Sequence, residues 1–174
     1  QKYLLKILIM NHKKISIGTA QFGSKYGITN NKILSMNEIK KILNFAFKNK
    51  INSIDTAAAY GNAEEKLGKI GLKGWNVSSK FPSIPIMEYG EEWIEINLLK
   101  SLMKLKKENL DTFFVHDISQ IHNFQSAKKI FIALSKLKQQ GLIKKIGISI
   151  YSMKKLDKII NDFEIDVIQS PANI

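Results

Sequence analysis

The sequence predicts an α/β fold, a (β/α)8 barrel truncated after about six strands, and three observations predict it. Short β-branched or apolar runs alternate with longer stretches of helical period, which is typical of strand–helix units repeated around a parallel sheet. The 174 residues, 44% of them hydrophobic, suffice for one domain with a sizeable core. Such strand–helix units fit either a (β/α)8 barrel or an open doubly wound sheet. Polar residues stand at or near the ends of successive strands, which favours the barrel, because in a barrel those ends open on one cavity whereas an open sheet would spread them out.

The elements follow one another in a regular order. Six strands are expected, at 15–21, 52–57, 76–80, 110–117, 144–150 and 166–170. Between them, apolar residues recur three and four positions apart, which places them on one face of a helix that packs on the sheet. These residues are Ile39, Ile42, Leu43, Ala46 and Phe47, then Ile94, Leu98, Leu102 and Leu105, then Ile130, Ala133, Leu134 and Leu137, and last Leu156, Ile159 and Ile160.

Helix boundaries carry capping signals. Ser35 with Glu38 has the capping-box pattern, and Asn62 with Glu65 offers the same geometry from an asparagine cap. Gly141 suits a left-handed residue just past the end of a helix. We expect one domain over residues 10–174, and residues 1–9 as an upstream or non-native extension, because the sequence from Met10 has the form of a natural start.

The positive charge of the chain suggests nucleic acid or an anionic membrane as a partner. There are 27 basic against 15 acidic residues, a formal charge of +12. Every basic residue is lysine, so the planar arginine fork that recognises guanine edges is missing. The lysines are scattered beside acidic and amide residues, as on solvated helix faces. We therefore expect no nucleic acid partner, and a basic nucleic-acid binder is an alternative that rests on charge alone.

The chain has no cysteine, which excludes a disulfide scaffold, a thiolate metal site and a cysteine nucleophile. A reducing cytoplasm is the expected location. The apolar run from Tyr3 to Met10 is interrupted by Lys6 and is too short to span a bilayer, so no membrane partner is expected.

Four residues on consecutive strand–helix units are candidates for catalysis. A phenol with an ordinary pKa of about 10 is a poor acid at neutral pH unless a cation lies beside it. We expect Lys80 to be that cation for Tyr60, and Asp55 to be its counter-ion, because an unpaired buried charge is costly. His116 would donate a hydrogen bond to a substrate oxygen. Such a set can protonate a carbonyl oxygen.

Each of these residues has a plainer interpretation on its own: a helix cap, a packing phenol, a surface lysine and a core histidine. The occurrence of all four residues on consecutive strand–helix units favours a catalytic role. Ser149 and Gln169, at the ends of the last two strands, are open to either interpretation.

The segment from Gly18 to Lys25 resembles a phosphate-binding loop, which would indicate an NTPase. However, lysine and serine are exchanged relative to that motif, and residues 26–31 have the composition of an extended turn. No helix N-terminus is then expected to hold a phosphate.

Five stretches, 17–23, 54–64, 79–80, 114–117 and 145–149, resemble the aldo/keto reductase family, the most specific being the DTAxxYGxxE motif of residues 55–64. The resemblance implies a (β/α)8 barrel that uses NADPH, less often NADH, and no metal. It implies that Tyr60 is the general acid, that Lys80 and Asp55 lower its pKa, and that His116 orients the carbonyl.

The same resemblance implies which residues contact the cofactor: Gly18, Thr19, Asp55, Ser149 and Gln169. The expected activity is NAD(P)H-dependent reduction of an aldehyde or ketone to an alcohol, with a small-molecule carbonyl substrate and sugar-derived compounds among the candidates. The sequence does not indicate the oligomeric state. A nicotinamide-binding regulatory subunit, or an inactive fragment, is the alternative. Because a complete barrel needs roughly 250 residues, we expect a fragment without the pyrophosphate-binding loops, with weak NADPH affinity and an exposed sheet edge.

Overall fold

The computed structural model describes residues 15–26, 32–83, 90–118, 124–151 and 156–171. The expected extension at residues 1–9 and most of the expected turn at 26–31 lie outside these residues. Six parallel strands form one sheet in chain order. They are β1 (Ile17–Gly18), β2 (Ser53–Asp55), β3 (Asn76–Phe81), β4 (Leu110–Val115), β5 (Ile143–Ser149) and β6 (Val167–Gln169).

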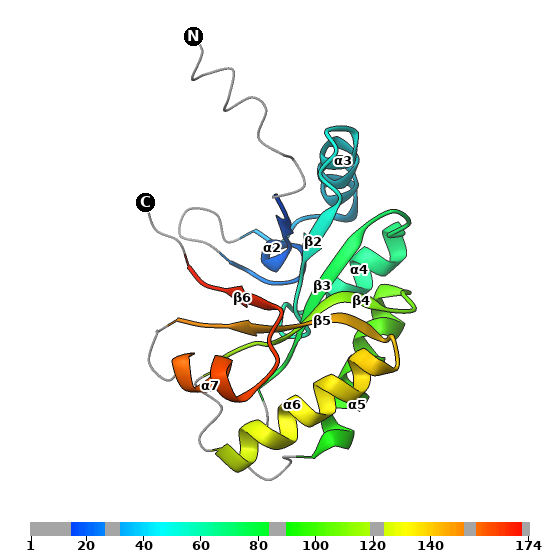
Figure 1. Cartoon of the computed structure of the whole chain (residues 1–174). Helices are drawn as coiled ribbons and strands as arrows, with labels where there is room; N and C mark the ends of the chain where they lie inside the picture. The colour runs from blue at the N-terminus through cyan, green and yellow to red at the C-terminus, as the bar shows by residue number, and fades with distance from the viewer. Residues whose placement is uncertain (1–14, 27–31, 84–89, 119–123, 152–155, 172–174) are drawn as a thin grey trace.

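Helices connect the strands and flank the curved sheet (Figure 1). Neighbouring helices contact one another in sequence, from α3 to α4, α4 to α5 and α5 to α6. The helices are α2 (Ala20–Gly23), α3 (Met36–Lys48), α4 (Ala63–Ile70), α5 (Glu91–Leu105), α6 (Phe124–Gln139) and α7 (Leu156–Asp162).

The order of the strands distinguishes the two α/β architectures. An open doubly wound sheet reverses its strand order at a switch point, whereas here every strand pairs with the next one in the chain. Strands added one after another in this way build a barrel. The structure therefore confirms the predicted barrel architecture, as a partial barrel of six strands.

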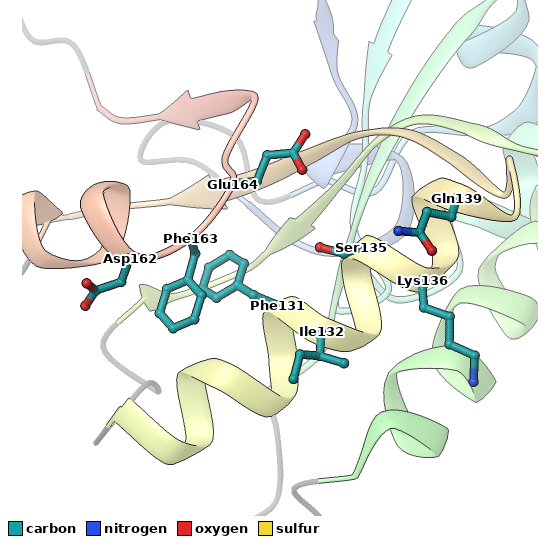
Figure 2. Close-up of a pocket in the computed structure, with 8 residues that line it drawn as sticks. All are labelled: Phe131, Ile132, Ser135, Lys136, Gln139, Asp162, Phe163 and Glu164. Carbon is teal, nitrogen blue, oxygen red and sulfur yellow. The ribbon is translucent and has the colours of Figure 1, made fainter.

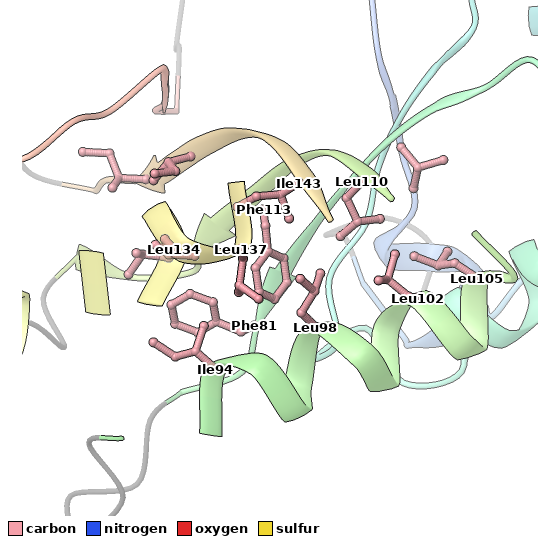
Figure 3. Close-up of a cluster of buried hydrophobic side chains, with 14 of the residues drawn as sticks. Phe81, Ile94, Leu98, Leu102, Leu105, Leu110, Phe113, Leu134, Leu137 and Ile143 are labelled. Carbon is pink, nitrogen blue, oxygen red and sulfur yellow. The ribbon is translucent and has the colours of Figure 1, made fainter. Parts of the chain in front are cut away.

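The main apolar core lies between the outer face of the sheet and the helices. Val77 and Phe81 of β3 alternate with inward-facing neighbours and belong to this core, as do Phe113 and Val115 of β4. The predicted helix faces meet them there, and Figure 3 shows α5 and α6 side chains packed against the strands. The labelled members are Phe81, Ile94, Leu98, Leu102, Leu105, Leu110, Phe113, Leu134, Leu137 and Ile143.

Two predicted capping signals have different outcomes. Ser35 and Glu38 form the capping box: the Ser35 N–H donates to Glu38 Oε2 at 2.8 Å, and the Glu38 N–H donates to Ser35 Oγ at 3.3 Å. The Ser35 hydroxyl also donates to Glu38 Oε2 at 2.7 Å. This bond, then the bond from the Ser35 N–H and then the one from Lys32, lower the pKa of Glu38 to about 2. Asn62 is the N-cap of α4, but its side chain makes no capping bond, so the second prediction was wrong. Gly141 is left-handed with φ of 74°, as predicted.

Three other expectations need correction. The first strand ends at Gly18 rather than at residue 21, because residues 20–23 turn into the short helix α2. Ile42 and Phe47 of α3 are exposed rather than buried, and Phe47 packs on Trp75 with ring centroids 5.4 Å apart. Ile160 of α7 is also exposed. These three residues are exposed because the predicted apolar stripe of each helix is wider than the face that the sheet covers.

Candidate active site

The candidate residues come together at one rim of the sheet. Gly18, Asp55, Ser149 and Gln169 are the last residues of β1, β2, β5 and β6. Gly18 pairs with Asp55 across β1 and β2, and Ser149 pairs with Gln169 across β5 and β6. The carboxyl ends of parallel strands share one edge, so this rim is where barrel enzymes build their active sites.

Lys80 and Asp55 form a buried ion pair at this rim. The Lys80 ammonium donates to Asp55 Oδ1 at 2.6 Å and to the carbonyl oxygen of Thr56 at 3.1 Å. The Lys80 side chain is 3% exposed and that of Asp55 is 20% exposed. Burial lowers the pKa of Lys80, and the nearby carboxylate opposes this by favouring the ammonium.

Tyr60 lies beside this pair on the loop between β2 and α4. The loop is held by backbone bonds in which the Ala58 N–H donates to the Lys80 carbonyl and the Ala63 N–H donates to the Tyr60 carbonyl. The Lys80 ammonium is 5.6 Å from the centroid of the Tyr60 ring. The His116 ring meets the Tyr60 ring edge to face, with centroids 6.0 Å apart and an interplanar angle of 84°. All four candidate residues therefore share one site.

The pKa of Tyr60 differs from the sequence expectation. It is raised to about 12, first by burial and then by the negative charge of Asp55. The expectation was a pKa lowered by Lys80, but Asp55 holds that ammonium at 2.6 Å and offsets its field at the phenol. Tyr60 therefore stays protonated through the neutral range, ready to donate rather than accept a proton.

Acid is expected to weaken the folded chain through His116. Burial, and then the charge of Lys80, lower its pKa below the ordinary 6.5, so the imidazole is neutral at pH 7. Below pH 6.5 the unfolded chain then binds more protons than the folded one, and the free energy of unfolding falls as the pH falls. Urea titrations between about pH 5 and 7.5 measure this slope. His116→Gln should flatten it, and an unchanged slope would contradict the assignment.

The remaining predicted residues surround Asp55 and the end of β6. Thr19 is fully buried, and its Oγ1 donates to the Asp55 carbonyl oxygen at 3.0 Å. Gln169 Nε2 donates to Asp55 Oδ2 at 3.3 Å, while Gln169 Oε1 is buried without a partner among the described residues. Ser149 is 6% exposed and stands next to Gln169 in register. Gly18 has nothing within 4 Å of the place where a side chain would begin.

Sequence reasoning missed Phe114 as a member of the site. Its ring lies 5.5 Å from the Lys80 ammonium, and the side chain is 4% exposed. Gly147 of β5 leaves room for this ring, because a Cβ there would overlap it. The period of two along a strand could have indicated Phe114, because it stands two residues before His116 and residues two apart in a strand face the same side.

Substitution of Gly23 is expected to disturb the Tyr60 loop. A Cβ at this position would overlap the Tyr60 carbonyl oxygen and the Ala63 nitrogen, both backbone atoms that cannot move aside. Gly23→Ala should therefore lower the free energy of unfolding by about 1–3 kcal/mol, as overpacking does. Urea unfolding measures this loss. Gly90→Ala is the matched control, because a Cβ there meets nothing closer than 4.0 Å.

Among the described residues, two cavities are candidates for a ligand site. A cleft of about 550 Å³ contains Gly18, Thr19, Asp55 and Tyr60. A smaller one of about 340 Å³ lies between α6 and the segment joining α7 to β6 (Figure 2), beside the stacked rings of Phe131 and Phe163. That segment precedes β6, so the smaller cavity belongs to the opposite rim, and of these two cavities it is the larger cleft that adjoins the candidate residues.

The described part of the chain offers neither a metal site nor a membrane-spanning helix. Its acidic and histidine side chains do not gather in a group of three or more that could hold a metal ion. Its helices are too short or too polar to cross a membrane.

The strand order and the polar rim are those of a (β/α)8 barrel with a site at the carboxyl ends of its strands. The model of the aldo/keto reductase family matches residues 14–174, and the chain belongs to this family. It is 33% identical over 144 residues to glyoxal reductase of Bacillus subtilis, covering 80% of this chain and 50% of that protein.

A second curated relative supports this membership, and a solved structure shares the fold. The chain is 33% identical over 127 residues to methylglyoxal reductase DkgA of Escherichia coli, covering 71% of this chain and 43% of that protein. An aldo-keto reductase of Bacillus halodurans in its holo form has the same fold, with a TM-score of 0.74 at 18% identity over 91% of this chain and 53% of that one. The chain spans about half the length of the curated relatives it matches.

Proposed function

We propose that the protein is an NAD(P)H-dependent reductase that converts an aldehyde or ketone to an alcohol, with Tyr60 as the general acid. The observation that carries this proposal is the buried Lys80–Asp55 pair against the Tyr60 ring, with His116 edge-on to the same ring. A protonated phenol, a cation and a neutral imidazole at one point suit proton delivery to a carbonyl oxygen.

The residues at the rim fit a nicotinamide. A buried amide oxygen without a partner, such as Gln169 Oε1, costs about 1–3 kcal/mol unless a donor reaches it. The carboxamide of a nicotinamide carries N–H donors of this kind, and Ser149 in the neighbouring strand adds a hydroxyl beside it. Gly18 and Thr19 adjoin the same cleft. NADPH is the proposed cofactor, with NADH as the alternative.

The chemistry then divides between the cofactor and the chain. A bound reduced nicotinamide supplies hydride to the carbonyl carbon. Tyr60 donates its proton to the carbonyl oxygen as negative charge develops there, and its pKa of about 12 is no obstacle, because an alkoxide is a stronger base than a phenolate. Lys80 stabilises the phenolate that remains. Neutral His116 donates an N–H to the same oxygen and orients it.

The names of the relatives suggest where to look for the substrate. Glyoxal reductase and methylglyoxal reductase are named for small dicarbonyl compounds. We propose a small carbonyl compound of this class or a sugar-derived aldehyde as the substrate, and a cytoplasmic location.

The experiment is a turnover assay of the intact protein, following loss of NADPH absorbance with glyoxal, methylglyoxal and an open-chain aldose. We expect NADPH consumption that depends on the carbonyl compound. Tight cofactor binding without turnover on any carbonyl compound would instead favour the regulatory-subunit alternative. NADH in parallel determines the cofactor preference.

A further inference from the structure

Glu64 is a buried carboxyl group that the proposed chemistry does not use. It lies in the first turn of α4 and is 2% exposed. Its Oε1 accepts a hydrogen bond from Ser79 Oγ at 2.7 Å, and Ser79 itself is fully buried. Burying a carboxyl group costs free energy even when a hydroxyl donates to it, so we expect a compensating role from its position in the fold.

This hydrogen bond lies directly behind the candidate active site. Val77 and Phe81 of β3 face the core between the sheet and the helices. Ser79 is two residues from each of them in the strand, so its side chain points to the same side. Lys80, the next residue, faces the opposite side, where it meets Asp55. The bond thus joins the start of α4 to the outer face of β3, one residue from the catalytic lysine.

The same helix start carries Tyr60. This residue stands four positions before Glu64, on the short loop that joins β2 to α4. The N-cap residue Asn62 provides no side-chain capping bond, so it does not fix the helix end. A carboxylate in the first turn, by contrast, interacts favourably with the positive end of the helix. Glu64 therefore ties the end of the Tyr60 loop to the strand that carries Lys80.

We propose that Glu64 is a positioning residue for Tyr60: its bond to Ser79 holds α4 on β3 and so sets the separation between the phenol and the Lys80 ammonium. The inference rests on the proposed function, because it names Tyr60 as the proton donor. A misplacement of about 1 Å can lower a rate by as much as 100-fold, so a single anchor behind the site has a measurable effect.

The test compares three variants of the intact protein. Glu64→Ala removes the anchor and should lower kcat by about 10- to 100-fold, with KM for the carbonyl compound within about threefold. Glu64→Gln keeps an amide oxygen that accepts from Ser79, and should restore kcat to within about threefold of the wild type. Glu65→Ala is the matched control, because Glu65 is the next residue of the same turn, half-exposed beside Lys104, and should leave kcat unchanged.

A second measurement does not depend on turnover. Tyrosines labelled with carbon-13 at Cζ report phenol ionisation by NMR, and Tyr60→Phe identifies the resonance. In the wild type, Tyr60 should remain protonated well past pH 10, since burial and Asp55 raise its pKa to about 12. In Glu64→Ala, the loosened loop should let the pKa fall toward its ordinary value of about 10.

Ser79→Ala decides the question if Glu64→Ala does not fold, because it removes only the donor of the same bond. A lowered kcat together with a lowered Tyr60 pKa supports the inference. A kcat equal to that of the wild type, or a lower melting temperature with both kcat and the Tyr60 titration unchanged, overturns it. Failure of the proposed function is distinguishable, because the wild type itself would then show no carbonyl reduction.

Discussion

Tyr60→Phe is expected to lower kcat by about 100- to 10,000-fold while cofactor affinity stays within about twofold of the wild type. The change deletes one hydroxyl and keeps the ring, so the contacts of that ring with His116 and Lys80 persist. What disappears is the proton that neutralises the developing alkoxide. Steady-state turnover gives kcat, and quenching of protein fluorescence by NADPH gives the dissociation constant.

Tyr151→Phe is the matched control for this prediction. It makes the same chemical deletion on a tyrosine that is 71% exposed and whose charge influences the Tyr60 pKa less than burial and Asp55 do, and kcat should fall far less than in Tyr60→Phe. A Tyr60→Phe enzyme that turned over at the wild-type rate would transfer the role of the acid to another group. Loss of cofactor affinity along with turnover would instead indicate that the hydroxyl serves binding.

The fold and the centre of the site could be predicted from the sequence, because both depend on local patterns. A strand in a parallel sheet is a short apolar run, and polar residues at or near its carboxyl end indicate the rim, so the sequence could place Asp55, Ser149 and Gln169 there. The regular alternation of strands and helices then left the barrel as the arrangement that gathers these ends together. The ion pair of Lys80 with Asp55 followed from the cost of burying either charge alone.

Other features depended on contacts between distant residues and could not be predicted in this way. The raised pKa of Tyr60 comes from its burial and from the charge of Asp55. The burial of Glu64, at the end of the recognised motif, depends on the packing of α4 over Ser79. The early end of the first strand reflects the turn from Thr19 into α2, which brings Gly23 against the Tyr60 loop.

The second large effect is expected from the Lys80–Asp55 pair, and it concerns stability as well as rate. Lys80→Met fills a similar volume but removes the cation, leaving the Asp55 carboxylate with the Gln169 amide as its partner. Breaking a buried ion pair from one side costs about 3–5 kcal/mol. Because the Asp55 side chain is 20% exposed, the loss for Lys80→Met should lie at the lower end of that range.

Asp55→Asn should lower the free energy of unfolding more than Lys80→Met does, because it leaves the Lys80 ammonium, whose side chain is 3% exposed, without its counter-ion. The double variant Lys80→Met with Asp55→Asn removes both charges and should unfold at a higher urea concentration than Asp55→Asn alone. A cycle of the four proteins measures this coupling. The two variants without Lys80 should lack turnover, since proton delivery needs the cation. Asp55→Asn should lower turnover for a different reason, because a buried ammonium without its counter-ion loses its proton more easily. If the two stability losses simply added, the pair at 2.6 Å would contribute no coupling energy, and the cation beside Tyr60 would need another counter-ion.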